Sequence, residues 1–177
     1  MTLGGDAALR LAEPRLAQPF AELVARNRER LDRWEAWAGD LSGVDAARAM
    51  LTSELQRFAA GTTVPAFVMS HGQLAGYASL RVEPVNRSGA LGYWIGADFG
   101  GRGLATAAVG ALARFGVDEL ALVRVSATIA VGNVRSTALV RRLGFRLDGV
   151  LRSGQVVRGA PGDVEVWSLL PGEFGSG

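Results

Sequence analysis

The sequence contains no cysteine and no lysine, and His71 is its only histidine. Without cysteine the chain can form no disulfide, no thiolate zinc site and no cysteine nucleophile, and we expect no metal cofactor. All 19 basic residues are arginines, which excludes the lysine of an ATP-type phosphate loop. His71 falls in a predicted hairpin turn away from the motifs described below, so we expect no catalytic role for it.

Long uncharged runs and a strong net charge are also missing. No stretch reaches the roughly 18 apolar residues of a membrane span, and residues 1–14 lack a basic region followed by an apolar core. We therefore expect a cytoplasmic protein without a membrane partner. The formal charge is only +2, and no basic run interleaved with aromatics marks a nucleic-acid face. A nucleic-acid partner is therefore not expected.

The chain does have enough apolar material to fill one core. Its 177 residues, 49% of them hydrophobic, can form one domain without disulfides or metals. We expect a single domain over residues 1–177, in which 171–177 form a loose tail.

The N-terminal third is expected to be mostly helical after a short strand at 9–11. Pro14 is tolerated in a first helical turn, and residues 14–37 then form one or two helices. A further helix over 44–60 ends at Gly61, which suits the left-handed position that follows a helix.

From residue 65 the apolar residues follow the period of strands. An apolar run followed by a turn predicts a hairpin over 65–82. The segment 123–131 is mostly apolar, so we expect a strand buried on both faces. The order of elements indicates a mixed α/β sheet. The other predicted elements are strands at 90–95, 145–152 and 164–170 and helices at 104–120 and 133–143.

A glycine-rich turn, Gly100-Gly101-Arg102-Gly103, precedes the predicted helix over 104–120. A helix that begins there points unpaired N–H groups outward, and glycine lets a diphosphate approach them without a Cβ in the way. Thr106 could donate its hydroxyl to the same phosphates. The glycines could equally form a tight turn that binds nothing. A dinucleotide site would need an acid at the tip of the next strand, where Val131 stands.

Four motifs follow one another along the chain. They are Leu91-Gly92-Tyr93-Trp94-Ile95-Gly96, Gly101-Arg102-Gly103-Leu104-Ala105-Thr106, Asn133-Val134-Arg135-Ser136 and Leu143-Gly144-Phe145. In this order they resemble the acyl-CoA core of GNAT N-acetyltransferases. The Gly-Tyr-Trp before the turn and the Asn-x-x-Ser after the next strand resemble the branch that acetylates the N-terminal serine or alanine of ribosomal proteins. The segment 27–37 is similar to that branch too, so the resemblance spans about residues 9–170.

The resemblance implies a GNAT-like fold, a mostly antiparallel sheet with a parallel, splayed central strand pair flanked by helices. The pantetheine arm of acetyl-CoA would enter between the parted strands and pair with the backbone of Ile95. Gly100 and Ala107 depart from the family, which often has Gln or Arg and an acid there. The implied cofactor residues are Trp94, Ile95, Gly101, Arg102, Gly103, Leu104, Ala105, Thr106, Asn133 and Ser136.

The resemblance also supplies catalytic candidates. It places Ser136 near the cofactor sulfur, where the hydroxyl could donate a proton or hydrogen bond to the leaving thiolate. Ser136 could instead be an ordinary first-turn residue of a helix capped by Asn133. Gln155 falls where some members of the branch have a glutamate base, and an amide can orient an amine but cannot accept its proton. Glu35 and Glu83 are alternative bases, each expected to be a solvated surface carboxylate.

Trp34 and Trp37 are three residues apart and are predicted to share a helix face. They could be core residues, whereas the resemblance implies that their helix lines the acceptor cleft with Trp34 as a wall. Asp163 resembles a family acid near the last strand, and a structural role for it is equally open.

The expected function is transfer of an acetyl group from acetyl-CoA to a primary amine, in particular the N-terminal α-amine of a protein or peptide. Alternatives with the same fold are a succinyl-CoA enzyme or one that acts on a small-molecule amine. A non-catalytic acyl-CoA sensor also stays open, because Gln155, Gly100 and Ala107 depart from the family pattern. The expected partners are acetyl-CoA and the amine acceptor, and a homodimer is left open.

Overall fold

The structure is a computed structural model that describes residues 1–35, 37 and 41–174. These residues form one eight-stranded sheet in the order β1-β2-β3-β4-β5-β6-β8-β7. Neighbouring strands are antiparallel except β5 and β6, which are parallel. The strands are β1 (Thr2–Gly4), β2 (Ala7–Leu11), β3 (Thr63–Ser70), β4 (Gln73–Glu83), β5 (Ser88–Ile95), β6 (Arg124–Ala130), β7 (Arg146–Val157) and β8 (Ala160–Leu169).

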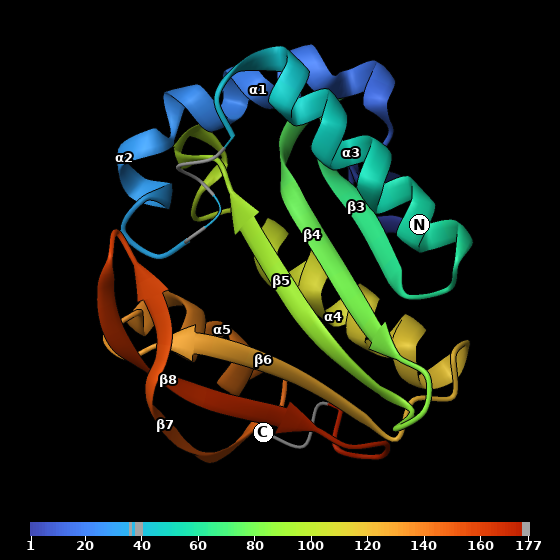
Figure 1. The fold of residues 1–177 in the computed structure, drawn as a ribbon. Coiled ribbons are helices and arrows are strands. Elements are labelled where there is room, and N and C mark those ends of the chain that lie inside the picture. Colours follow the sequence, from blue (N-terminus) through green and yellow to red (C-terminus); the bar gives the residue numbers. More distant parts are fainter. Residues whose placement is uncertain (36, 38–40, 175–177) are drawn as a thin grey trace.

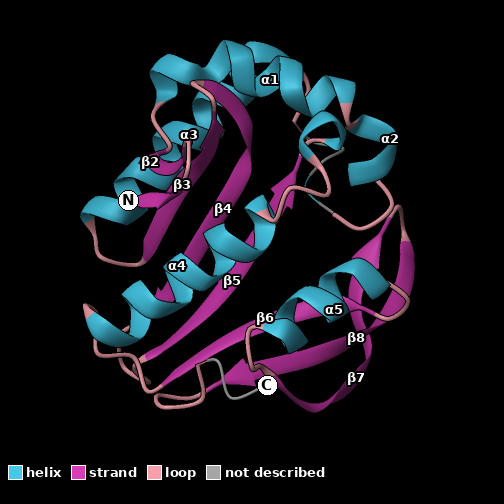
Figure 2. Cartoon of the chain, turned by 180° about the vertical axis from the view of Figure 1, so that it is seen from behind, coloured by secondary structure: helices cyan, strands magenta, loops and turns pink. Residues whose placement is uncertain are grey.

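Helices cover both faces of the sheet, with α1 and α3 on one face and α4 and α5 on the other (Figures 1 and 2). Each face has its own apolar cluster. Phe20 and Phe67 lie in the cluster beneath α1 and α3, and Val109 and Leu112 lie in the cluster beneath α4. The helices are η1 (Pro14–Leu16), α1 (Ala17–Arg26), α2 (Arg28–Leu31), α3 (Gly43–Ala59), η3 (Ala97–Phe99), α4 (Leu104–Asp118) and α5 (Val134–Arg142).

The mixed sheet and the order of its elements confirm the predicted fold class. Pro14 opens η1, and Gly61 follows α3 with a φ of +71°, as expected. The ends of two predicted elements are wrong. The helices predicted up to residue 37 end at Leu31, and the strand predicted over 145–152 continues to Val157.

The two parallel strands β5 and β6 separate halfway along their length (Figure 1). Their pairing joins residues 88–91 to residues 124–127 and then stops. β6 continues to pair with β8 as far as Ala130, so the two halves of the sheet diverge from this point. The prediction that this strand is buried on both faces is therefore wrong: Thr128 is exposed, because one face of β6 borders the opening.

The end of the described chain contacts the fold. Residues 171–177 were predicted to form a loose tail; of these, Phe174 packs against the cluster beneath α4, with the Arg114 guanidinium 5.5 Å from its ring centre. Glu173 pairs with Arg146 at 3.3 Å. Residues 175–177 lie outside the described part. Among the residues that the structure describes, no helix is both long enough and apolar enough to cross a membrane.

Candidate active site

Where β5 and β6 part, they enclose an inner cavity of about 160 Å³. The cavity has room for roughly five waters, at about 30 Å³ each. Residues from six separate parts of the chain meet around it. Its polar lining residues are Glu35 after α2, Arg81 on β4, Tyr93 on β5, Thr128 on β6, Asn133 and Ser136 at the start of α5, and Gln155 on β7.

One edge of this opening is the free backbone of β5. The Gly96 N–H donates to Ala75 O of β4. Because hydrogen-bonding directions alternate along a strand, the N–H and C=O of Tyr93 and Ile95 point the other way, toward β6. The Ile95 carbonyl already accepts a hydrogen bond from the Arg30 guanidinium. An added extended chain could therefore pair with this edge at Tyr93 and the Ile95 N–H, and Arg30 would have to move for the Ile95 carbonyl to take part.

The glycine-rich turn leads into α4 with its backbone exposed. Gly101 and Gly103 have φ values of +75° and +74°, and a Cβ built on either would meet no atom within 4 Å. The first helical hydrogen bond runs from Ala107 N–H to Gly103 O, so the N–H groups of residues 104–106 precede it. Positive φ and open space together leave a concave stretch of backbone that fits a diphosphate, as a helix N-terminus favours an anion.

Positive side chains surround the same end of the cleft. The exposed Arg102 lies 5.9 Å from the centre of the Phe99 ring. Burial, followed by the nearby Arg135 guanidinium, lowers the pKa of Arg30. Two guanidinium groups held close together repel each other, and a bound anion would relieve that repulsion. This end of the cleft therefore suits the phosphates of a CoA donor.

Ser136 is fixed at the start of α5. Asn133 Oδ1 accepts a hydrogen bond from the Ser136 N–H at 3.3 Å, which confirms Asn133 as the helix cap. One residue further on, the Thr137 hydroxyl donates to Glu165 of β8 at 2.9 Å. Neither contact involves the Ser136 hydroxyl. The hydroxyl is therefore not needed to cap or anchor α5 and can face the cavity.

Tyr93 contributes a buried hydroxyl that lies next to the Ser136 side chain without a well-aligned hydrogen bond. Burial raises the pKa of Tyr93, the neighbouring Ser136 side chain opposes the shift, and the Glu35 carboxylate adds to it. A protonated phenol is a hydrogen-bond donor, and this one can turn toward Ser136 or toward a bound group. It lies beside the serine that was predicted to stand near the cofactor sulfur.

Gln155 reaches the cavity because β7 is irregular. The register between β7 and β8 shifts between Leu151 and Gln155, and Ser153 in this bulge has a φ of +50°. Asp163 Oδ1 accepts from the Ser153 N–H at 2.8 Å. Asp163 therefore stabilises the bulge that positions Gln155, which supports its structural reading.

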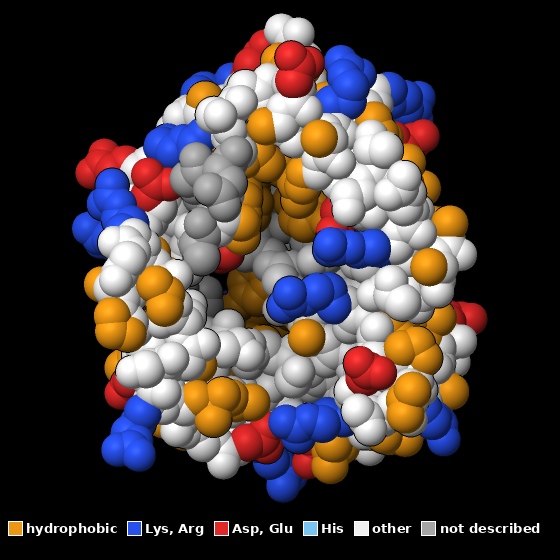
Figure 3. All heavy atoms as spheres, viewed as in Figure 1, with side chains coloured by type: hydrophobic (Ala, Val, Ile, Leu, Met, Phe, Trp, Pro, Cys, Tyr) orange, Lys and Arg blue, Asp and Glu red, His pale blue; other side chains and the backbone are white. Residues whose placement is uncertain are grey.

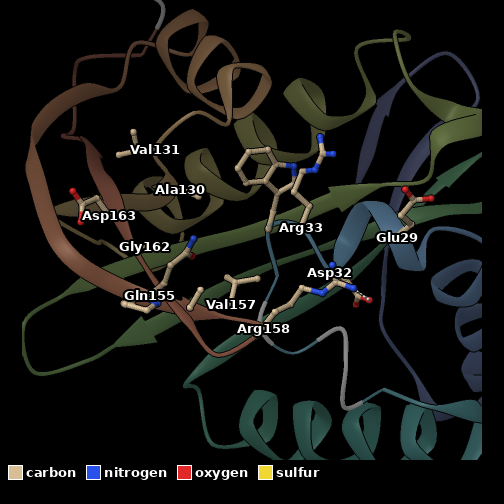
Figure 4. Close-up of a pocket in the computed structure, with 13 residues that line it drawn as sticks. Glu29, Asp32, Arg33, Ala130, Val131, Gln155, Val157, Arg158, Gly162 and Asp163 are labelled. Carbon is tan, nitrogen blue, oxygen red and sulfur yellow. Dashed lines mark ion pairs between the residues drawn. The ribbon is translucent and has the colours of Figure 1, made fainter.

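An outer pocket of about 760 Å³ adjoins the inner cavity, and Trp34, Ala130 and Gln155 line both. Figure 4 shows Gln155 on the strand side and Asp32, from the segment after α2, joined to Arg158. The Arg158 guanidinium reaches across from the β7–β8 hairpin to Asp32 at 3.8 Å. The space-filling view shows the molecule hollowed on this face, with basic side chains at the edge (Figure 3). The cleft thus opens on the face opposite to α4 and α5.

The three tryptophans predicted at the site occupy different places. Trp34 lines both cavities, as expected of a wall for the acceptor. Trp37 packs instead against Trp94, with ring centres 6.3 Å apart. Trp34 and Trp37 both lie beyond the end of α2, so the prediction that they share a helix face is wrong. Trp37, predicted to bind substrate, lines neither cavity.

Trp94, predicted as a cofactor residue, lies outside the lining of both cavities. Its indole is buried in the cluster beneath α1, 6.1 Å from the Phe20 ring centre. Its backbone pairs with Tyr77 of β4, on the side away from the opening. Side chains alternate along a strand, so Tyr93, one residue earlier, is the aromatic that faces the cleft.

Glu35, one of the two alternative bases suggested by the sequence, belongs to the site, whereas Arg81, Tyr93 and Thr128 line the inner cavity without having been predicted as site residues. Predicted to be a solvated surface carboxylate, Glu35 is partly buried and lines the inner cavity. Burial raises the pKa of Glu35, while the hydrogen bond from Trp37 and the positive charge of Arg81 oppose that shift. Glu83, the other candidate, is exposed at the end of β4, as expected. In the sequence, only the position of Glu35 between Trp34 and Trp37 could have indicated that its side chain belongs to the site.

Comparison with known proteins agrees with this geometry. The family model of the acetyltransferase (GNAT) domain matches residues 8–146 of the sequence. The chain belongs to the GNAT acetyltransferase family. Over 168 residues it is 37% identical to YdaF of Bacillus subtilis (strain 168), named provisionally as a ribosomal N-acetyltransferase, covering 94% of this chain and 92% of YdaF. It is 24% identical to the ribosomal-protein-serine acetyltransferase of Escherichia coli (strain K12), covering 86% of each chain.

Solved structures share the fold of this GNAT enzyme. RimL, a ribosomal L7/L12 alpha-N-protein acetyltransferase in complex with coenzyme A, superposes with a TM-score of 0.92 at 22% identity, over 95% of this chain and 96% of RimL. The microcin C7 self-immunity acetyltransferase MccE, in complex with acetyl-CoA and AMP, gives 0.90 at 22% identity, over 95% and 92%. The predicted GNAT fold, with its splayed parallel pair, is thereby confirmed, and acyl-CoA is the co-substrate of such enzymes.

Proposed function

We propose that this enzyme transfers an acetyl group from acetyl-CoA to the N-terminal α-amine of a protein or peptide in the cytoplasm. The observation that supports this proposal most is the two-part cleft. The inner cavity of about 160 Å³ suits a short acyl group and the reacting amine. The outer pocket of about 760 Å³ has room for several residues of a chain end behind that amine. The names of the relatives agree with a ribosomal-protein acceptor.

In this proposal the donor lies along the free edge of β5, with its diphosphate at the turn before α4. The implied residues that fit this role are Ile95 at the edge and the backbone of residues 101–106, with Arg102 at the rim. Asn133 and Ser136 flank the thioester. The amine nitrogen attacks the acetyl carbon, the C–N bond forms and the C–S bond breaks. The Ser136 hydroxyl donates a hydrogen bond to the sulfur as negative charge develops on it.

Gln155 lies at the junction of the two cavities and orients the incoming amine through its side-chain carbonyl. Trp34 forms the wall beside it. An α-amine is an easily deprotonated acceptor, because its ordinary pKa of about 7.7 to 8.0 leaves roughly a third of it neutral near pH 7.5. A lysine amine, at about 10.4, is neutral to only about one part in a thousand.

The test uses one peptide in three forms: with a free N-terminus, with that N-terminus blocked, and with a single internal lysine added. CoA release and mass spectrometry of the product locate the acetyl group. We expect modification of the α-amine, loss of the reaction on blocking, and little modification of lysine. Parallel reactions with succinyl-CoA and with a polyamine test the alternative donor and acceptor. Preferred reaction at lysine, or at the polyamine, would overturn the proposal.

A further inference from the structure

The Glu35 carboxyl group is held at a defined position in the inner cavity. It follows α2 in a turn, and its side chain lines the same space as Ser136 and Gln155. The Trp37 Nε1–H donates to Glu35 Oε2 at 2.8 Å. Within the described residues no hydrogen bond engages Oε1. One carboxylate oxygen is thus anchored, and the other can receive a proton.

Among the described residues, the charged and titratable groups that interact with Glu35 are Arg81 from β4 and Tyr93 from β5. α5 and β7 contribute the neutral side chains of Ser136 and Gln155 to the same cavity. Burial makes the carboxylate more basic than one on the surface, while Arg81 and the Trp37 indole limit this effect. The Glu35 carboxylate is therefore a stronger base than an exposed glutamate.

The size of the cavity brings Glu35 within reach of the reacting amine. At about 160 Å³ the space holds only a few waters. A general base has to contact the proton it removes directly or through one water. An amine placed between Ser136 and Gln155 would occupy the same small cavity as Glu35, so the proposal requires that they meet directly or through one water.

We propose that Glu35 is the general base of the reaction. It would take the role of the glutamate that some members of the branch carry at the position of Gln155. This inference rests on the proposed α-amine acetylation. The α-ammonium group gives one proton to Glu35, and the neutral nitrogen forms the C–N bond. As the C–S bond breaks, the nitrogen loses a second proton, which ends on the CoA thiolate. The product amide keeps one N–H, and Glu35 returns its proton to solvent. The base therefore lies on the wall opposite to β7.

The main test is Glu35→Gln in the full chain, assayed with acetyl-CoA and the free N-terminal peptide. Glutamine keeps an oxygen that can accept from Trp37, so the anchoring contact can be retained. We expect kcat near neutral pH to fall about 100-fold, the lower end of the range for general-base catalysis, while the Kd for CoA stays unchanged. Glu83→Gln removes an equal charge from an exposed position outside both cavities and should leave kcat unchanged.

The pH profile provides a readout that a purely structural role would not change. The base acts when ionised, so kcat/KM of the wild type should rise with pH through the pKa of Glu35. Glu35→Gln should abolish that rise. Trp37→Phe removes a hydrogen bond that lowers the pKa of Glu35, so the rise should move to higher pH. If the Trp37 variant fails to fold, Arg81→Gln takes its place. It removes the positive charge that lowers the pKa of Glu35, so the rise in kcat/KM should again move to higher pH.

The outcomes separate this inference from the proposed function. If the wild type acetylates the α-amine and Glu35→Gln keeps both its kcat within about threefold and its pH profile, Glu35 is not the base and the proposed function still stands. If the wild type does not acetylate the α-amine, both proposals are overturned.

Discussion

The donor wall and the acceptor wall of this cleft are built from different parts of the chain. The donor wall is regular structure: the free edge of β5 and the first turn of α4 present backbone N–H and C=O groups. The acceptor wall is made of side chains on irregular segments. Trp34 and Glu35 follow the end of α2, and Gln155 lies in a bulged strand. Backbone groups can recognise what all acyl-CoA molecules share, whereas side chains on turns can be exchanged without changing the sheet.

The largest expected effect tests the donor wall. Thr106→Asp places a carboxylate in the first turn of α4, where it stabilises the helix itself by roughly 0.3–1 kcal/mol. Two unit charges 4 Å apart near a protein surface interact by about 4 kcal/mol, so repulsion of the diphosphate should weaken CoA binding by more than about 100-fold. Titration calorimetry measures this affinity. Thr106→Asn is the neutral control, and an unchanged affinity in the Asp variant would place the phosphates elsewhere.

The second prediction concerns the point where the two walls meet. Ser136→Ala keeps the backbone N–H that Asn133 caps, so α5 should remain intact. A hydrogen bond to a charged group is worth about 1.5–3 kcal/mol, and kcat should therefore fall about 10- to 100-fold. The KM for acetyl-CoA should change little, because the bond forms mainly as charge develops on sulfur. Steady-state kinetics distinguish the two effects. Ser136→Thr, which restores a hydroxyl, should recover part of the rate; an unchanged kcat in the Ala variant would remove Ser136 from the mechanism.

The contrast between the walls also explains how far sequence reasoning reaches. The donor wall was predictable, because glycines at 101 and 103 and a capping Asn133 are local requirements of the backbone. Tyr93 and Trp94 show the limit on the strand itself. Adjacent residues face opposite sides of the sheet, and only the pairing of β5 with β4 settles which of them faces the cleft.

The acceptor wall was less predictable, because its residues meet through tertiary contacts. Glu35 is an ordinary acidic residue in a charged segment, and its burial depends on the packing of Trp37 against Trp94. The position of Gln155 depends on a bulge that Asp163 stabilises from the next strand. No local pattern encodes either contact, whereas the resemblance to the family indicated Gln155 through its neighbours in the chain.

The third prediction tests the acceptor wall alone. Gln155→Ala removes one neutral hydrogen bond to the amine, worth about 0.5–1.5 kcal/mol. We expect the acceptor KM to rise by about two- to tenfold, with the Kd for CoA unchanged. Val156→Ala is a matched control, since Val156 is 55% exposed and is the next residue along the strand. Gln155→Glu should add an ionisation to the pH profile. A loss of CoA affinity in either Gln155 variant would show that the two walls are not independent.

The smallest expected effect is on stability. The pKa of Glu35 is raised in the folded protein, chiefly by burial. The native state therefore binds this proton more tightly than the unfolded state does. The free energy of unfolding should consequently be highest below the ordinary pKa of a glutamate and should fall as the pH rises through the raised pKa of Glu35. Glu35→Gln, which cannot ionise, should lack this loss.

The measurement is the difference in Tm between wild type and Glu35→Gln at pH 4 and at pH 7.5, because other titrating groups cancel in that difference. A shift of one pKa unit corresponds to about 1.4 kcal/mol, and hydration of the open cavity reduces this figure. We therefore expect the variant to gain only a few degrees relative to wild type between the two pH values. Glu83→Gln should show no such gain. If the Tm of the variant shows no such gain, or falls relative to wild type, the folded protein does not disfavour the ionised form of Glu35. In that case the buried carboxylate on the acceptor wall does not lower the stability of the protein.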